Sequence, residues 1–192
     1  GDDVLLTKGT LGRTSNTATC SFGSLTIAAD GIFIAPSGTT TITGENGSGY
    51  AWHNNGTYTH NNGKVLIDYD TADTSLDTTV QENIWNDFEI KLDSASDYVV
   101  FKDNSGSVVT FLGDLTITKG QFDDHSNGDE YIIHGQTIVE TDGDFGRTTA
   151  WHSGDITHHG LVTLNGGTYY RSSAGGTVKM NSGIRNIGGS VL

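Results

Sequence analysis

The residues best suited to chemistry lie in a pattern that occurs twice. Segments 51–65 and 150–162 each read Ala-Trp-His, a glycine turn, an aromatic or aliphatic residue, Thr-His, a second glycine turn, and a residue before Val. Each copy contributes two histidines, His53 and His60 in the first and His152 and His158 in the second. Two imidazoles per copy could bind a transition metal, but no Cys, Asp or Glu accompanies them at a fixed ligand spacing in both copies. We therefore interpret the histidines first as corner residues of a repeated structural unit.

Aromatic residues beside these histidines offer a second chemistry, because flat rings suit the C–H faces of sugars. The aromatic residues that could form such a strip are Trp52, Tyr58, Trp151, Tyr169 and Tyr170. Packing in the core or at an interface is the simpler role for them. The candidate ligand-binding set is therefore Trp52, His53, Tyr58, His60, Trp151, His152 and His158, with a cell-surface glycan as the candidate ligand.

An acidic segment at residues 123–130 is the candidate metal site. Its oxygen donors, of the kind that Ca²⁺ prefers, are Asp123, Asp124, Asn127 and Asp129. The segment lacks the alternating ligand spacing and the final Glu of an EF-hand loop. A solvated turn is the simpler interpretation, so we expect no cofactor and keep Ca²⁺ as the alternative.

Nothing in the sequence indicates an enzyme. No G-x-S-x-G elbow, P-loop, dinucleotide fingerprint or H-E-x-x-H motif is present. Paired carboxylates hydrolyse glycosides in some enzymes, but among 23 acidic residues some pair can always be chosen. We therefore expect no catalytic residues.

Composition and charge limit the partners. The 192 residues include 23 acidic and 10 basic side chains, for a net charge of -13. This charge disfavours nucleic acid and anionic membranes, since both need clusters of Lys and Arg. No apolar run approaches the ~20 residues that span a bilayer. The single cysteine, Cys20, cannot form an internal disulfide, and we expect it in the core.

Short β-forming runs separated by turns predict an all-β fold. The chain has 27 Gly and one Pro, and apolar or Thr-interleaved triplets such as L-T-I recur at 25–27 and 115–117. Residues 88–92 alternate apolar and charged side chains and predict a half-buried strand. The Asp- and Thr-rich residues 68–83 are expected to be an excursion with little structure.

The order of these runs repeats in the two halves. Units 1–97 and 98–192 share the L-T-I segment and the histidine pattern, and each holds several shorter rungs. Stacked coils would place two residues of each triplet inside and one outside. We therefore predict one continuous parallel β-solenoid, a β-helix-like stack of short strands, with a β-sandwich as the alternative.

Several fragments resemble a loose family of repeat-rich β-solenoid proteins from bacteriophage virions and bacterial surface adhesins. They are Y-T-H-N-N-G-x-V, N-D-F-E-I-K and G-D-L-T-I-T-K-G-x-F. The family commonly has Asn before Leu-Thr-Ile, where this chain has Ser24 and Asp114. The resemblance implies a structural or adhesive role in a fibre, tail or surface component.

We therefore expect a non-enzymatic structural protein, a β-solenoid module of a phage virion fibre, a virion decoration or an extracellular filament. Open strand edges at the ends of a solenoid predict self-association, contact with other structural subunits or a continuing chain. A glycan- or receptor-binding adhesin is the first alternative and a polysaccharide depolymerase the second. The expected location is extracellular or on a virion surface.

Overall fold

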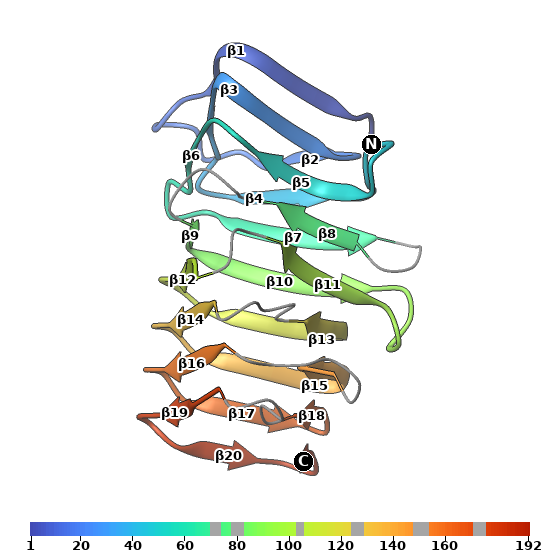
Figure 1. The fold of residues 1–192 in the computed structure, drawn as a ribbon, viewed down its shortest axis with the longest axis vertical. Coiled ribbons are helices and arrows are strands. Elements are labelled where there is room, and N and C mark those ends of the chain that lie inside the picture. Colours follow the sequence, from blue (N-terminus) through green and yellow to red (C-terminus); the bar gives the residue numbers. More distant parts are fainter. Residues whose placement is uncertain (70–73, 78–82, 103–105, 124–128, 148–153, 171–175) are drawn as a thin grey trace.

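The chain folds as a parallel β-solenoid of about seven turns, which confirms the solenoid prediction over the sandwich. The computed structural model describes residues 1–69, 74–77, 83–102, 106–123, 129–147, 154–170 and 176–192. These residues contain strands and turns but no helix, and therefore no helix able to cross a membrane. The coils stack along one axis with the two termini at opposite ends (Figure 1).

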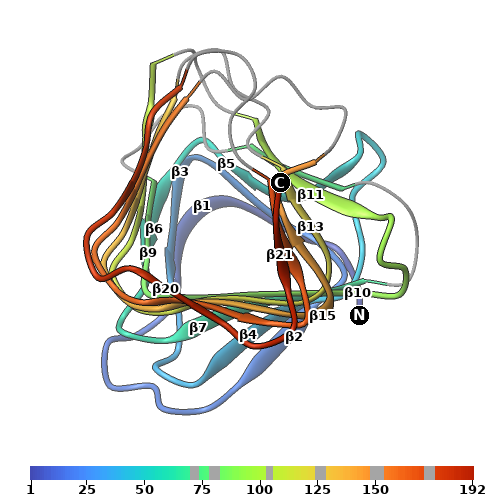
Figure 2. The ribbon, with the colours of Figure 1, turned by 90° about the horizontal axis from the view of Figure 1, so that it is seen from below.

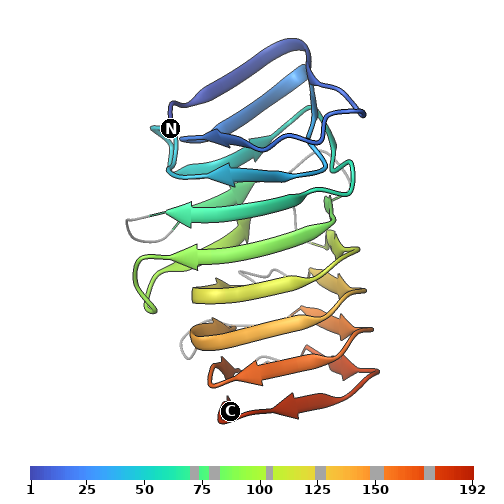
Figure 3. The same ribbon diagram turned by 180° about the vertical axis from the view of Figure 1, so that it is seen from behind.

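Seen along the axis, the coils enclose a three-sided cross-section (Figure 2). The first face is a parallel stack of β1 (Val4–Gly12), β3 (Leu25–Ile34), β5 (Tyr50–Asn54), β8 (Thr74–Asp77), β11 (Tyr98–Lys102), β13 (Leu115–Asp123), β15 (Thr137–Phe145), β18 (Thr168–Tyr169) and β21 (Ser190–Val191). The second face holds β2 (Cys20–Phe22), β4 (Thr39–Ile42), β7 (Lys64–Tyr69), β10 (Asp87–Leu92), the first halves of β13 and β15, β17 (Val162–Asn165) and β20 (Ile184–Asn186) (Figure 3).

The third face contains the second halves of β1 and β3 with β6 (Thr57–Thr59), and a separate five-stranded sheet. That sheet consists of β9 (Asn83–Trp85), β12 (Val108–Phe111), β14 (Glu130–Ile133), β16 (Asp155–His158) and β19 (Val178–Met180). All paired strands run parallel, and paired residues are 20 to 28 apart in sequence, as in Cys20 with Thr40 and Lys91 with Lys119. This interval is the length of one coil. Division of the solenoid into units 1–97 and 98–192 stays a prediction.

Long strands turn a corner of the cross-section without a break in the chain. The first half of β13 pairs with β10, and its second half pairs with β11. The register shifts after Ile117, and Gly120 has a φ of 95° at the bend. A positive φ is easy for glycine and strained for other residues, so this corner depends on residue type.

In the central coils, alternate residues of the short strands face inward and are mostly apolar, as the triplets predicted. In the triplet 115–117, Leu115 and Ile117 are fully buried and the Thr between them is partly exposed. In β10, Phe88, Ile90 and Leu92 are buried and alternate with more exposed charged residues, which confirms the half-buried strand. Cys20 lies against the same core, as expected.

The interior contains a continuous chain of aromatic rings from Phe22, at the end of β2, to Tyr169, at the end of β18. Successive ring centroids are 4.6 to 5.9 Å apart along Phe22, Phe33, Trp52, Trp85, Phe88, Phe101, Phe122, Phe145 and Tyr169. Edge-to-face and offset contacts of this kind add about 0.5–1.5 kcal/mol per pair to the burial itself. Each coil is therefore coupled to the next by side chains as well as by backbone.

One prediction was wrong. Residues 68–83 were expected to be an unstructured excursion, yet residues 74–77 form β8, a strand of the first face between β5 and β11. Its Leu76 is fully buried in the core. Pairing with two neighbouring coils overrides the polar composition around this short strand. The predicted excursion also includes residues 70–73 and 78–82, which lie outside the described residues.

The aromatic chain predicts where a substitution costs most. Phe101→Ala should lower the free energy of unfolding by about 3–5 kcal/mol, because a fully buried ring that contacts five neighbouring rings is replaced by a cavity. Ile32→Ala, at a partly exposed position of β3, should cost less than about 1 kcal/mol. Urea unfolding followed by circular dichroism measures both, and equal costs would contradict this packing.

Candidate functional site

The first copy of the histidine pattern does not form one site. Trp52 is fully buried and its ring contacts Phe33, Tyr58 and Trp85, so it cannot stack on a sugar at the surface. Tyr58 packs against the same core, and burial raises the pKa of its hydroxyl far above the ordinary value. Both belong to the packing of the third and fourth coils.

The two histidines of this copy contact residues that are close to them in sequence. His53 Nε2 lies 2.9 Å from Asn55 Nδ2, and its ring lies 5.1 Å from that of Tyr50. His60 Nδ1 accepts a hydrogen bond of 3.1 Å from the backbone N–H of Asn62. Asn61 and Asn62 have φ values of 47° and 56°, so His60 begins a corner in the left-handed region, where asparagine is tolerated.

His158 has a different environment from its counterpart His60. It ends β16, is fully buried, and has both ring nitrogens occupied. Nδ1 lies 2.8 Å from the hydroxyl of Thr137, and Nε2 lies 2.9 Å from the hydroxyl of Tyr169. Burial lowers the pKa of His158 to about 4, so the imidazole is neutral at pH 7. Tyr169, in the predicted sugar strip, is likewise buried. Trp151 and His152 lie outside the described residues.

The described members of the candidate Ca²⁺ site are engaged elsewhere. Asp123 forms an ion pair of 2.8 Å with Arg147. Asp129 is buried, and one oxygen accepts hydrogen bonds of 2.9 and 3.0 Å from the backbone N–H groups of Gly106 and Ser107. Asp124 and Asn127 lie outside the described residues. In the part of the chain that the structure describes, no group of three or more His, Cys, Asp or Glu could hold a metal ion.

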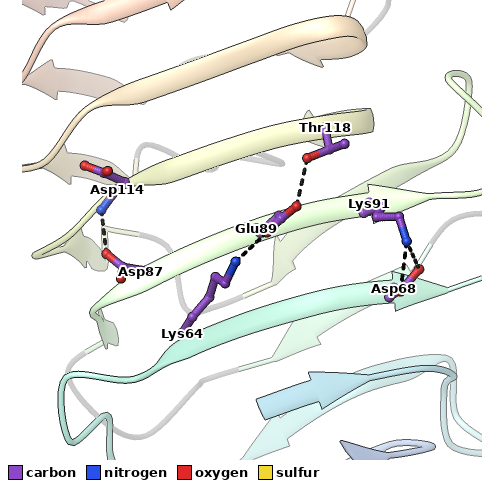
Figure 4. A network of polar contacts seen from close by, with 7 residues as sticks. All are labelled: Lys64, Asp68, Asp87, Glu89, Lys91, Asp114 and Thr118. Atoms are coloured by element: carbon purple, nitrogen blue, oxygen red, sulfur yellow. Dashed lines mark hydrogen bonds and ion pairs between the residues drawn. The ribbon is translucent and has the colours of Figure 1, made fainter. Parts of the chain in front are cut away.

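Carboxylates link successive coils at the corners. Asp87 accepts a hydrogen bond of 2.9 Å from the backbone N–H of Asp114, one coil later (Figure 4). Asp114 in turn accepts one of 2.7 Å from Gln136, and Asp155 accepts one of 2.7 Å from Thr177. These acidic residues therefore satisfy backbone donors at the turns. Much of the acidity of the chain has a structural use.

Charged side chains on the second face form a ladder of the same kind. Glu89 bonds to Lys64 at 2.7 Å and to Thr118 at 2.8 Å, and Lys91 contacts Asp68 at 3.1 Å (Figure 4). Burial by itself raises the pKa of Glu89, but the bonds from Lys64 and Thr118 and the nearby cations together lower it below its ordinary value. Partly exposed pairs of this kind contribute up to about 1 kcal/mol each.

The terminal coils carry most of the exposed apolar side chains and the unpaired strand edges of the described structure. Of the nine large apolar residues that are exposed in the described segments, six lie there: Leu5, Leu11, Ile184, Ile187, Val191 and Leu192. In the described structure, β1 and β2 pair on one side only, as do β19, β20 and β21. Each terminal coil therefore presents an open parallel strand edge next to apolar side chains.

Charge also distinguishes the two ends. All 23 acidic residues and seven of the ten basic residues lie in positions 1–155, for a formal charge of -16. Residues 156–192 contain three basic residues and no acidic one, for a charge of +3. Lys179 and Arg185 of this set lie in the last coil. The solenoid is an acidic rod with a basic C-terminal end.

Comparison with protein-family models, with curated proteins and with solved structures finds no match.

Part of this arrangement was readable in the sequence and was missed. The absence of acidic residues after Asp155 is visible by counting. The stacked pair His134 and His159, with rings 4.8 Å apart and 5° from parallel, is one coil apart and shares no repeated motif. The burial of His158 depends on Thr137 and Tyr169, which no local pattern connects to it.

The depressed pKa of His158 predicts acid sensitivity. The unfolded chain binds a proton at this residue below about pH 6.5, and the folded chain only below about pH 4. Stability from this group is therefore complete above pH 6.5 and is lost as the pH falls to 4, by about 3 kcal/mol at most.

Substitution of His158 measures its contribution to the pH dependence of the free energy of unfolding. His158→Gln should remove most of the pH dependence of unfolding between pH 6.5 and 4, while His159→Gln, at an exposed position, should keep it. Denaturant unfolding at a series of pH values measures the difference. A wild-type curve that coincides in slope with that of His158→Gln would contradict the buried neutral imidazole.

Proposed function

We propose that this chain is a non-enzymatic structural module that assembles end to end, so that the last coil of one copy stacks on the first coil of the next. The open strand edges of the two terminal coils carry the proposal. The resemblance of its repeat motifs to solenoids of phage virions and surface adhesins directs the proposal to a virion fibre or an extracellular filament.

Backbone hydrogen bonds give the direction of assembly. In β21, the N–H groups of Ser190 and Leu192 donate back to the previous coil, at 3.0 and 2.9 Å. Alternate residues of a parallel strand bond to opposite neighbours, so the N–H of Val191 faces the open end. At the other end, the N–H of Val4 donates to the carbonyl of Ser24, just before β3, which leaves the backbone groups of Leu5 facing outward.

A parallel coil continues its ladder only with a coil that runs in the same direction. Joining the C-terminal edge of one copy to the N-terminal edge of another satisfies this condition, whereas joining two like ends would oppose the strands. The contact is heterologous and does not close on itself by a two-fold axis, so it can repeat along a filament.

Side chains and charge favour the same contact. Leu5 is 64% exposed and Leu192 is 63% exposed, and they lie at opposite ends of the solenoid. Contact between the ends of two copies removes this apolar surface from water, which is favourable. Acidic bodies repel one another side by side, whereas the basic last coil of one copy meets a first coil whose two acidic and two basic residues leave it without net charge. Axial growth is therefore favoured over lateral clustering.

A proline in the edge tests the backbone part of the proposal. Val191→Pro removes an N–H that faces the open end and places a ring in the path of the next strand. We expect this variant to weaken association by about tenfold or more, whereas Val191→Ala, which keeps the N–H, should weaken it less. Light scattering over a concentration series measures both. A wild-type chain that stays monomeric at every concentration would overturn the proposal.

Charge reversal tests the electrostatic part. The double variant Lys179→Glu/Arg185→Glu should weaken association by about tenfold at low ionic strength, with a smaller effect at about 1 M salt, where the Debye length is only ~3 Å. The control Lys102→Glu/Lys119→Glu makes the same change in net charge in the middle of the rod. Equal weakening by both variants would show that net charge alone, not the basic end, controls assembly.

A further inference from the structure

A recess of about 410 Å³ lies on the outer side of the first face. Its floor is formed by Ser75 of β8 and Val100 of β11, which are paired neighbours in the ladder. Val99 and Phe101 point into the core, so Val100 between them points outward, yet it is only 3% exposed, and Ser75 is 5% exposed. The floor therefore lies well below the surrounding surface.

One wall of the recess comes from the same strand as the floor. Tyr98 and Lys102 flank Val100 at two-residue spacing and share its outward side. The guanidinium of Arg147 lies 3.8 Å from the centre of the Tyr98 ring, and Arg147 is itself held by Asp123. The Lys102 ammonium lies 5.8 Å from the centre of the Tyr50 ring. Both wall residues are therefore supported by neighbours outside the recess.

The opposite wall is the loop that precedes β5, which contributes Glu45, Ser48 and Gly49. Asn46 fixes this loop. Its side-chain oxygen accepts hydrogen bonds of 2.9 and 3.2 Å from the N–H groups of Ser48 and Tyr50, and its amide donates to Thr26 at 3.2 Å. The wall is shaped before any ligand arrives, so little ordering entropy would oppose binding.

The lining matches a ligand that is polar, uncharged and partly apolar on one face. Glu45 and Lys102 contribute one charge of each sign, and Ser48 and Ser75 add hydroxyls, so hydrogen-bond donors and acceptors are both present. Tyr98 and Val100 provide the surfaces that suit C–H groups. A lipid would leave the charges unpaired, and a polyanion would meet the acidic body of the rod.

We propose that this recess binds a neutral carbohydrate unit, with sugar hydroxyls bonded to Glu45 and Lys102 and the apolar face of a ring against Tyr98 and Val100. The volume is in the range of small-molecule sites in proteins. The site draws on strands from neighbouring coils and lies on the side of the rod, away from the terminal coils. It therefore goes beyond the structural role, and end-to-end assembly would display it at intervals along a filament.

The experiment uses an array of unsubstituted oligosaccharides of glucose, galactose, mannose and N-acetylglucosamine, followed by titration of the sugars that bind. Glu45→Gln and Lys102→Met each remove a charged hydrogen-bonding group while keeping side-chain size. We expect each to lower the affinity for the bound sugar by about tenfold or more. Glu130→Gln and Lys119→Met are matched controls elsewhere on the solenoid and should leave the affinity unchanged.

Three results would overturn the proposal: no neutral sugar binds, binding is the same in all four variants, or sulfated glycans or peptides bind more tightly through the same residues. Thermal unfolding checks that each variant keeps its fold. If Lys102→Met does not fold, the affinity of Glu45→Gln alone tests the proposal. Light scattering of the same proteins separates this proposal from assembly, because loss of sugar binding with normal association would leave the structural role intact.

Discussion

Parallel backbone hydrogen bonding between successive coils is the constraint on which the rest of the structure depends. Each named strand pairs with strands one coil before or after it, at intervals of 20 to 28 residues. Coil length can vary because corners absorb the difference, but the ladder cannot be satisfied within the first or last coil. Strand edges at the two ends, and the polarity of the rod between them, follow directly from this constraint.

The ladder also determines which side chains face the core and which face solvent. Inward positions stack into apolar columns joined by aromatic contacts. His158 is buried beside these columns, where two hydroxyls satisfy its ring nitrogens. Outward carboxylates such as Asp87 and Asp114 bond to backbone N–H groups of the following coil. These acidic residues therefore satisfy backbone donors at the corners.

Sequence patterns predicted the strands with local periodicity and missed the features set by stacking. The triplet 115–117 and the alternating residues 88–92 show their inward faces by type alone, so the solenoid could be predicted. The strand at 74–77 has polar flanks and is fixed by its neighbours in the first face. Trp52 lies in the core, which was the simpler role for it, while the recess combines Ser75 and Val100, 25 residues apart, with a loop that no local pattern connects to them.

Electron microscopy of the 192-residue chain at high protein concentration tests end-to-end assembly most directly. The second face stacks eight described strands, and eight rungs spaced by about 4.8 Å give an axial repeat of roughly 38 Å per copy. The account predicts unbranched filaments, one solenoid wide, with a repeat close to that length and a 4.8 Å spacing along the axis. Discrete single-chain particles at every concentration, or closed dimers joined by like ends, would contradict it.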